Sequence, residues 1–119
     1  MTKHIKLGKE GERLATDFLE RKGYIILERN YRFKKVEIDI IAKKDNILSV
    51  VEVKTRSSTY YGNPEAFVKP QQIKNLVAAI DQYIISNDLD MEVQFDIIAI
   101  VKEKNETKIE HLENAFYHF

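Results

Sequence analysis

Two apolar runs that follow one another in the chain carry charged residues where a buried strand should be apolar. Residues 36–42 largely alternate between branched apolar and acidic side chains, and residues 47–54 form the second run. The polar segment 43–46 between them predicts a β-hairpin. Burying a charge costs free energy unless the charge is paired or used. The charges in this hairpin therefore indicate either a functional site or the solvated face of a half-buried strand.

The predicted register of this hairpin decides which charges face each other. If the chain turns over 43–46, Asp39 lies opposite Val50 and Glu37 lies opposite Glu52. Because side chains alternate between the faces of a strand, Asp39 and Glu52 are then diagonal neighbours on one face, with Cβ atoms about 7 Å apart. We expect two carboxylates to lean together at this place.

Lys54 shares a face with Glu52, and the three charges together suit metal-assisted chemistry on phosphates. Two close carboxylates repel each other unless a positive charge lies between them, and either Lys54 or a divalent cation would supply it. Mg²⁺ prefers oxygen ligands, commonly one or two carboxylates with waters and a phosphate oxygen. Such an ion polarises a phosphodiester and lowers the pKa of a water molecule, while a lysine offsets charge on phosphorus. Asp39, Glu52 and Lys54 would supply the parts for this chemistry.

Composition limits the chain to a single domain spanning 1–119. Its 119 residues are 44% hydrophobic and 32% charged, and they include no cysteine. A chain of this length buries roughly two-thirds of its unfolded surface, which is enough for one core without disulfides. No apolar run approaches the roughly 20 residues of a bilayer span, so we expect a cytoplasmic protein with no membrane partner.

The spacing of apolar residues predicts an α/β fold in the order helix, three strands, helix, strand, strand. Apolar residues have helical spacing over residues 6–22, a segment that Gly23 terminates, and over residues 70–87. The first helix places Glu12 beside Gly8 and Leu19 at the rim of its apolar face. The apolar stripe of the second helix consists of Ile73, Leu76, Val77, Ile80 and Ile84. The predicted strands are 24–32, 36–42, 47–54, 93–101 and 109–112.

Candidate nucleic-acid contacts lie in local basic patches, because 19 basic and 19 acidic residues give no net charge that would attract phosphates. Basic side chains bind phosphates, and aromatic rings stack on unpaired bases. An ordinary mixed-charge surface is the alternative interpretation. The candidates are Arg29, Arg32, Lys34 and Lys35, interleaved with Tyr31 and Phe33, then Arg56 near Tyr60 and Tyr61, and finally Lys69 and Lys74.

Several other charged or titratable residues have structural interpretations. Glu37 either supports the carboxylate pair, faces solvent or pairs with Lys54. Asp96, at the edge of an apolar strand, is expected to be a paired structural charge. The histidines have no ligand-like spacing and are expected on the surface; they are His4, His111 and His118.

The motifs together resemble those of known proteins. Asp39 followed by Glu52, Val53 and Lys54, in this order of helices and strands, is similar to the PD-(D/E)XK, or restriction-endonuclease-like, nuclease superfamily. A closer match, over nearly the whole chain, is to the YraN family of uncharacterised bacterial proteins. It rests on Gly8-Lys9-x-Gly11-Glu12 with Ala15, Gly23-Tyr24, Arg29-Asn30-Tyr31, residues 37–42 and 51–56, Gly62-x-Pro64 and Phe95-Asp96. The chain departs from the family pattern at Val36, where glycine is usual, and at Gln71 or Gln72, where lysine is common.

The resemblance implies a restriction-endonuclease-like αβββαβ core, with a mixed central sheet flanked by helices and a short C-terminal strand. It assigns catalytic roles to Glu12, Asp39, Glu52 and Lys54. Asp39, Glu52 and the backbone carbonyl of Val53 would be the ligands of a divalent metal, expected to be Mg²⁺ or Mn²⁺. A similarity to archaeal Holliday junction resolvases implies DNA or structured nucleic acid as the partner.

The sequence as a whole predicts a metal-dependent endonuclease, or a nuclease-like protein that binds DNA or structured nucleic acid. Cutting both strands of a branched duplex needs two copies, so a homodimer is expected with that activity. Two alternatives stay open, because a nuclease fold does not by itself establish nuclease activity. One is a non-catalytic nucleic-acid-binding module on the same fold, and the other is a protein-interaction scaffold.

Overall fold

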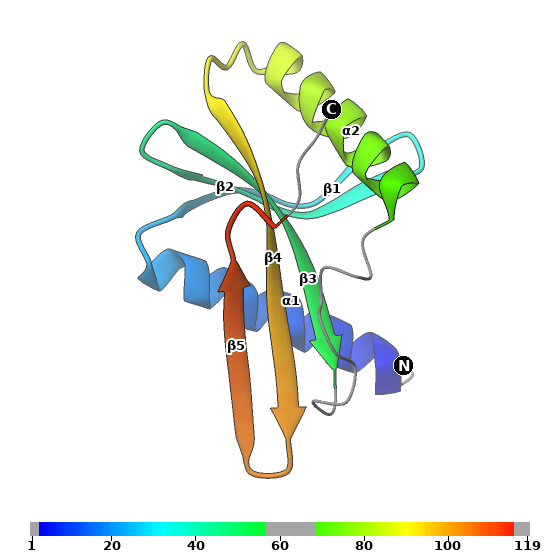
Figure 1. Cartoon of the computed structure of the whole chain (residues 1–119), viewed down its shortest axis with the longest axis vertical. Coiled ribbons are helices and arrows are strands. Elements are labelled where there is room, and N and C mark those ends of the chain that lie inside the picture. Colours follow the sequence, from blue (N-terminus) through cyan, green and yellow to red (C-terminus); the bar gives the residue numbers. More distant parts are fainter. Residues whose placement is uncertain (1–2, 57–68, 116–119) are drawn as a thin grey trace.

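The computed structural model describes residues 3–56 and 69–115. Two helices and five strands follow one another in the predicted order, which confirms the α/β class (Figure 1). Tyr60, Tyr61, Gly62 and Pro64, which the sequence singles out, lie outside the described residues. The elements are α1 (Lys3–Arg21), β1 (Ile25–Phe33), β2 (Val36–Lys44), β3 (Ile47–Arg56), α2 (Pro70–Ser86), β4 (Glu92–Glu103) and β5 (Glu106–Leu112).

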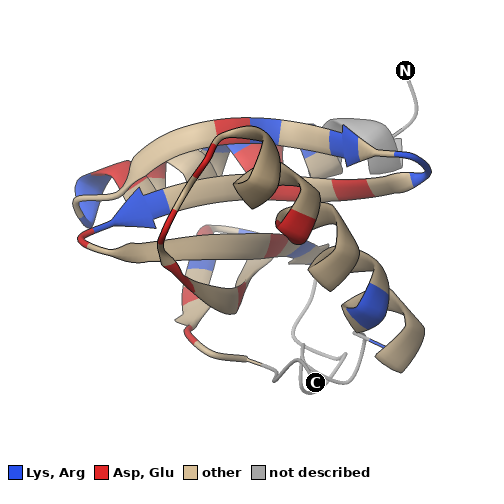
Figure 2. Ribbon diagram, turned by 90° about the horizontal axis from the view of Figure 1, so that it is seen from above, with Lys and Arg blue, Asp and Glu red and all other residues tan. Residues whose placement is uncertain are grey.

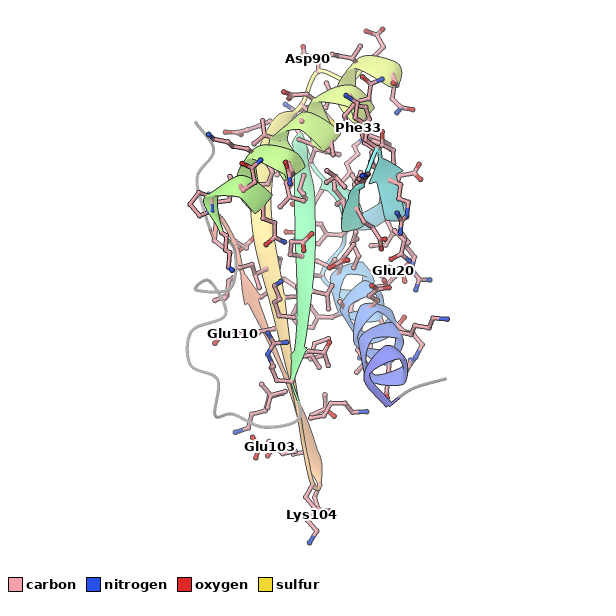
Figure 3. The ribbon with its side chains drawn as sticks, turned by 90° about the vertical axis from the view of Figure 1, so that its right-hand side faces the viewer. Glu20, Phe33, Asp90, Glu103, Lys104 and Glu110 are labelled. Carbon is pink, nitrogen blue, oxygen red and sulfur yellow. The ribbon has the colours of Figure 1, made fainter. Side chains whose placement is uncertain are left out.

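The five strands form one mixed sheet in the order β1-β2-β3-β4-β5. β3 and β4 are parallel, and the other neighbours are antiparallel. A parallel pair needs a crossover connection, and α2 lies within it. Seen from the side, α1 and α2 flank β3 from opposite faces, while the β4–β5 hairpin extends away to Glu103 and Lys104 (Figure 3). Neither helix in the described part of the chain is long and apolar enough to cross a membrane.

Each face of the sheet buries a separate apolar core. On the α2 face, Ile41, Leu48 and Val50 pack with Leu76 and Ile80. On the α1 face, the strand residues Ile40, Val51 and Ile98 pack with the helix residues Ala15 and Leu19.

The observed helix faces correct two sequence expectations. Leu19 is fully buried rather than at the rim of α1. The buried face of α2 is rotated toward Ala79 and Tyr83, so that Val77 is only half-buried. Which face of an amphipathic helix is buried depends on the tilt at which it meets the sheet, and periodicity alone does not fix that tilt.

The hairpin between β2 and β3 forms, but its predicted register is wrong by two residues. The connection is the two-residue turn Asp45–Asn46, and Lys44 pairs with Ile47. Asp45 has a φ of 55°, a left-handed conformation that Asp and Asn tolerate better than most residues. A shift of two residues by itself moves no side chain to the other face, so the apolar pattern could not distinguish the two registers.

β2 and β3 separate before either strand ends. Their ladder runs only from Lys44–Ile47 to Ile40–Val51. Beyond that pair, β2 continues against β1 while β3 continues against β4. Figure 1 shows the result, in which β1 and β2 run across the molecule while β3, β4 and β5 run along it. The sheet therefore opens into a fork on the carboxyl side of Val51.

A buried polar network joins the end of α1 to β4 and β5. The His111 side chain is 3% exposed, which corrects the expectation that it lies on the surface. Lys22 Nζ lies 2.7 Å from His111 Nδ1, and His111 Nε2 lies 2.8 Å from Asp96 Oδ2. An ammonium group only donates hydrogen bonds, so Nδ1 accepts and Nε2 donates to Asp96. Asp96 is fully buried and is the paired structural charge that its position predicted.

We expect Asp96→Ala to lower the free energy of unfolding by about 2–4 kcal/mol, because it leaves three donors, one of them on the buried His111 ring, without their acceptor. These donors are His111 Nε2, Gln94 Nε2 and the Asn114 N–H. Urea denaturation measures the change, with Asp81→Ala on the exposed side of α2 as the control. A loss as small as that of the control would contradict the structural role.

Candidate functional site

A cleft of about 360 Å³ opens at the fork of the sheet. It contains acidic residues from α1 and β2 and basic residues from the end of β3, so charges of both signs share one small space. Its lining consists of Gly8, Glu12, Asp39, Val53, Lys54, Thr55 and Arg56. The structure therefore brings together three of the four predicted catalytic residues and the predicted carbonyl ligand.

Asp39 holds the fork open by replacing a strand-to-strand hydrogen bond. Its Oδ2 accepts a hydrogen bond from the backbone N–H of Val53 at 2.8 Å. In a continued ladder, this N–H would instead bind the backbone of β2. Ile38 packs in the α2 core and Ile40 in the α1 core, so the alternation of β2 is interrupted at Asp39. The local irregularity lets the carboxylate reach β3.

Glu12, Glu37 and Asp39 form a compact group of carboxylates. One oxygen of each lies within 4.8 Å of the other two. Asn30 stands across from Asp39 on β1 and has a φ of 54°. With its amide nitrogen assigned toward the acids, Asn30 donates to Glu12 Oε1 at 3.2 Å and to Glu37 Oε1 at 2.9 Å. Glu37 also forms an ion pair with Arg32 at 3.2 Å, and these contacts hold Glu37 beside the site.

Glu52 lies at the same fork but is held by the other helix. Its side chain is buried, and Gln72 Nε2 of α2 donates to Glu52 Oε2 at 3.3 Å. Glu52 Oε1 is buried with no hydrogen-bond partner among the described residues. The sequence left open which of Gln71 and Gln72 belongs to the site, and the structure gives Gln72 the contact with Glu52.

Both central carboxyls resist ionisation. Burial is the main cause that raises the pKa of Asp39 to about 6; the Val53 hydrogen bond opposes it, and the Glu12 and Glu37 charges add to it. Burial and then the charge of Asp39 raise the pKa of Glu52 to about 8, against the opposing effect of Lys54. Removing carboxylates from water and placing them near each other both penalise the charged form.

α1 approaches the end of β3 closely enough to require a glycine. A Cβ at Gly11 would overlap the Thr55 hydroxyl. This contact positions the helix so that Glu12, the next residue, reaches the cleft. Lys54 and Arg56 line the cleft on either side of Thr55, and Arg56 Nη1 donates to the Thr55 carbonyl at 2.9 Å.

The predicted nucleic-acid residues are distributed over several elements. Arg29, Arg32, Lys34 and Lys35 are exposed on β1 and at the β1–β2 turn, where Figure 2 shows basic residues. Arg32 is paired with Glu37, and Lys34 lies over the Phe33 ring at 5.3 Å. Lys69 and Lys74 are exposed at and near the start of α2. Of the predicted set, Arg56 is the residue that lines the cleft.

Comparison with known sequences identifies the relatives of the chain. Residues 11–100 match the family described as "Uncharacterised protein family UPF0102". The chain belongs to the UPF0102 family. A UPF0102 protein of Flavobacterium psychrophilum is 61% identical over 119 residues, which cover all of both chains. One of Christiangramia forsetii is 56% identical over the full length of both, and one of Thermodesulfovibrio yellowstonii is 48% identical over 95% of this chain and 97% of its own.

In this UPF0102 protein, the structure adds residues that sequence reasoning missed or left undecided. Asn30 belongs to the Arg29-Asn30-Tyr31 motif, but the sequence assigned it no role. Gly8 was predicted to lie beside Glu12 at the rim of the first helix and was assigned no role either. No local signal predicts that Asn30 reaches α1, because this contact depends on how β1 and α1 meet in space. The Arg32–Glu37 pair follows from the β1–β2 register, which pairs these two residues directly.

With divalent cations chelated, we expect Glu52→Gln to raise the free energy of unfolding of this UPF0102 protein relative to wild type, and to raise it more at pH 8 than at pH 5. The raised pKa values mean that the native state binds more protons than the unfolded chain between about pH 4 and pH 8, so its stability falls as pH rises through this range. Glutamine removes the larger part of this effect, about 1–3 kcal/mol at pH 8. Urea denaturation across this pH range measures it, with the exposed Glu110→Gln as the control. Equal pH dependence in wild type and Glu52→Gln would contradict the assignment.

We expect Gly11→Ala to destabilise the fold by about 1–2 kcal/mol, because the overlap with Thr55 exceeds the helix-propensity gain. Gly8→Ala should change stability in the opposite direction, by up to about 1 kcal/mol, since its Cβ meets no described atom within 4 Å. Thermal denaturation of the pair measures both changes. Two shifts of the same sign would rule out the close contact between α1 and β3.

Proposed function

We propose that the cleft binds a divalent cation and hydrolyses phosphodiester bonds of DNA or structured nucleic acid. The observation that carries this proposal is the convergence of Glu12, Glu37 and Asp39 beside Lys54 in one cleft. Carboxyls that lie close together next to a lysine are more typical of catalytic sites than of packed cores.

The arrangement of the elements supports a restriction-endonuclease-like fold. The order α1, β1, β2, β3, α2, β4, with a parallel β3–β4 pair and helices on both faces, matches the αβββαβ core that the sequence resemblance implies. The fork then lies where the Asp39 and Glu52-x-Lys54 motifs meet. β5 is the additional C-terminal strand.

The residues at the fork fit a hard divalent cation. Asp39 and Glu12 offer carboxylate oxygens, and Glu52 offers a buried Oε1 without a partner among the described atoms. The Val53 N–H points toward β2, and in a strand the carbonyl of the same residue points to the same edge, so it too is directed into the fork. Such a cation, when bound, would polarise a phosphate and lower the pKa of a water molecule.

The chain's own residues would position the reacting groups. Lys54 lines the cleft next to the carboxylates and would offset the negative charge that builds on the phosphorus oxygens. Asp39 and Glu12 would orient the attacking water. Water attacks phosphorus, the bond from phosphorus to the leaving oxygen breaks, and that oxygen takes up a proton. The exposed basic residues of β1 and the β1–β2 turn would contact more distant phosphates.

We expect Mg²⁺ and Mn²⁺ to bind wild-type protein and to support cleavage of a four-way DNA junction, a flap or a single strand. Calorimetric titration, with and without the DNA, measures the first, and a gel assay measures the second. Asp39→Asn and Glu52→Gln should each abolish metal binding and lower cleavage at least about 100-fold, since each removes a ligand charge. A homodimer, measured by light scattering, is expected with cleavage of both strands.

Matched controls separate this proposal from its alternatives. Glu110→Gln, an exposed change of the same type, should retain metal binding and cleavage. Binding of DNA without cleavage by any metal would leave a non-catalytic nucleic-acid-binding module. Absence of both would favour a protein-interaction scaffold.

A further inference from the structure

Gly8 occupies a position that the packing of the described residues does not explain. It lies inside α1, where glycine destabilises a helix by roughly 1 kcal/mol relative to alanine. A Cβ at this position would meet no described atom within 4 Å. Gly11 differs, because the Thr55 side chain excludes a Cβ there. The packing of the described residues therefore accounts for Gly11 and leaves Gly8 without a structural reason.

The space that the described residues leave beside Gly8 belongs to the cleft. Gly8 and Glu12 are one helical turn apart and therefore share a face of α1. Both line the cleft with Asp39 and Lys54. The missing side chain widens the cleft next to the carboxylates, so that a ligand can reach the helix backbone. Glycine is the residue that permits such a close approach.

Basic side chains at this opening can bind an anionic ligand. Lys54 and Arg56 line the cleft and supply positive charge beside the carboxylates of Glu12 and Asp39. The cleft volume of about 360 Å³ lies within the range of sites that hold a small-molecule-sized group. A sugar–phosphate unit has both the negative charge and the bulk that this opening accepts.

We infer that the α1 surface at Gly8 is the place where the sugar–phosphate backbone of a polynucleotide packs against the protein. This inference rests on the proposed function and deepens it, because it assigns to α1 the contact that brings a phosphodiester to Glu12 and Asp39. A leucine side chain at Gly8 would project from α1 into the space that the backbone needs. The surface recognises the backbone rather than a base, so it carries no sequence preference of its own.

The test compares wild type with Gly8→Leu, using fluorescence anisotropy of a labelled four-way junction and a labelled single strand, with Ca²⁺ replacing Mg²⁺. We expect Gly8→Leu to weaken binding to both probes by about tenfold or more, and Gly8→Ala to have a smaller effect. Thermal stability and Mg²⁺ affinity in calorimetry should not fall, since leucine favours helices and meets no described atom there. The control is Ala78→Leu, which adds the same side chain to an exposed position of α2.

The outcomes distinguish this inference from the proposed function. If wild type binds DNA and Gly8→Leu binds it equally well, the inference is overturned while the proposed function stands. If Gly8→Leu weakens binding only together with a loss of thermal stability or of Mg²⁺ affinity, Gly8 is a structural residue and the inference is also overturned. If wild type binds neither probe, both proposals fail.

Discussion

The hydrogen bond from the Val53 N–H to Asp39 is the interaction on which the candidate site depends. It ends the β2–β3 ladder at Ile40–Val51 and turns two neighbouring strands into the sides of a fork. With a backbone acceptor in its place, the ladder would continue and close the space between them. The Asp39 side chain thus both ends the β2–β3 ladder and lines the cleft, so its structural role and its place in the site depend on the same contact.

The site combines features that destabilise a folded chain. The half-buried Asp39 and the buried Glu52 have raised pKa values, and a helix carries an interior glycine near them. Such local conflicts in an otherwise consistent structure concentrate at functional sites. The two apolar cores on either side of the sheet supply the stability that tolerates them. The Asp96–His111–Lys22 network is different, because its charges and donors satisfy one another.

Sequence reasoning found the order of elements and most of the cleft. Periodicity separated two helices from five strands, and charges inside apolar runs singled out Asp39, Glu52 and Lys54. The hairpin register was wrong by two residues, since a shift of two by itself moves no side chain to the other face and the apolar pattern does not detect it. The burial of His111 was missed, because its partners Lys22 and Asp96 are distant in the chain and meet only in the folded protein.

The sequence by itself determined the local features of this UPF0102 protein: helix and strand periods, the hairpin, and the carboxylates placed where apolar residues are expected. These follow from the spacing of residues that are close in the chain. The tertiary structure decided where β2 leaves β3, that Asn30 joins Glu12 to Glu37, and that Gly8 faces an open cleft while Gly11 meets Thr55. These features depend on how distant segments pack, and side-chain shape and strand twist set that packing after the local elements have formed.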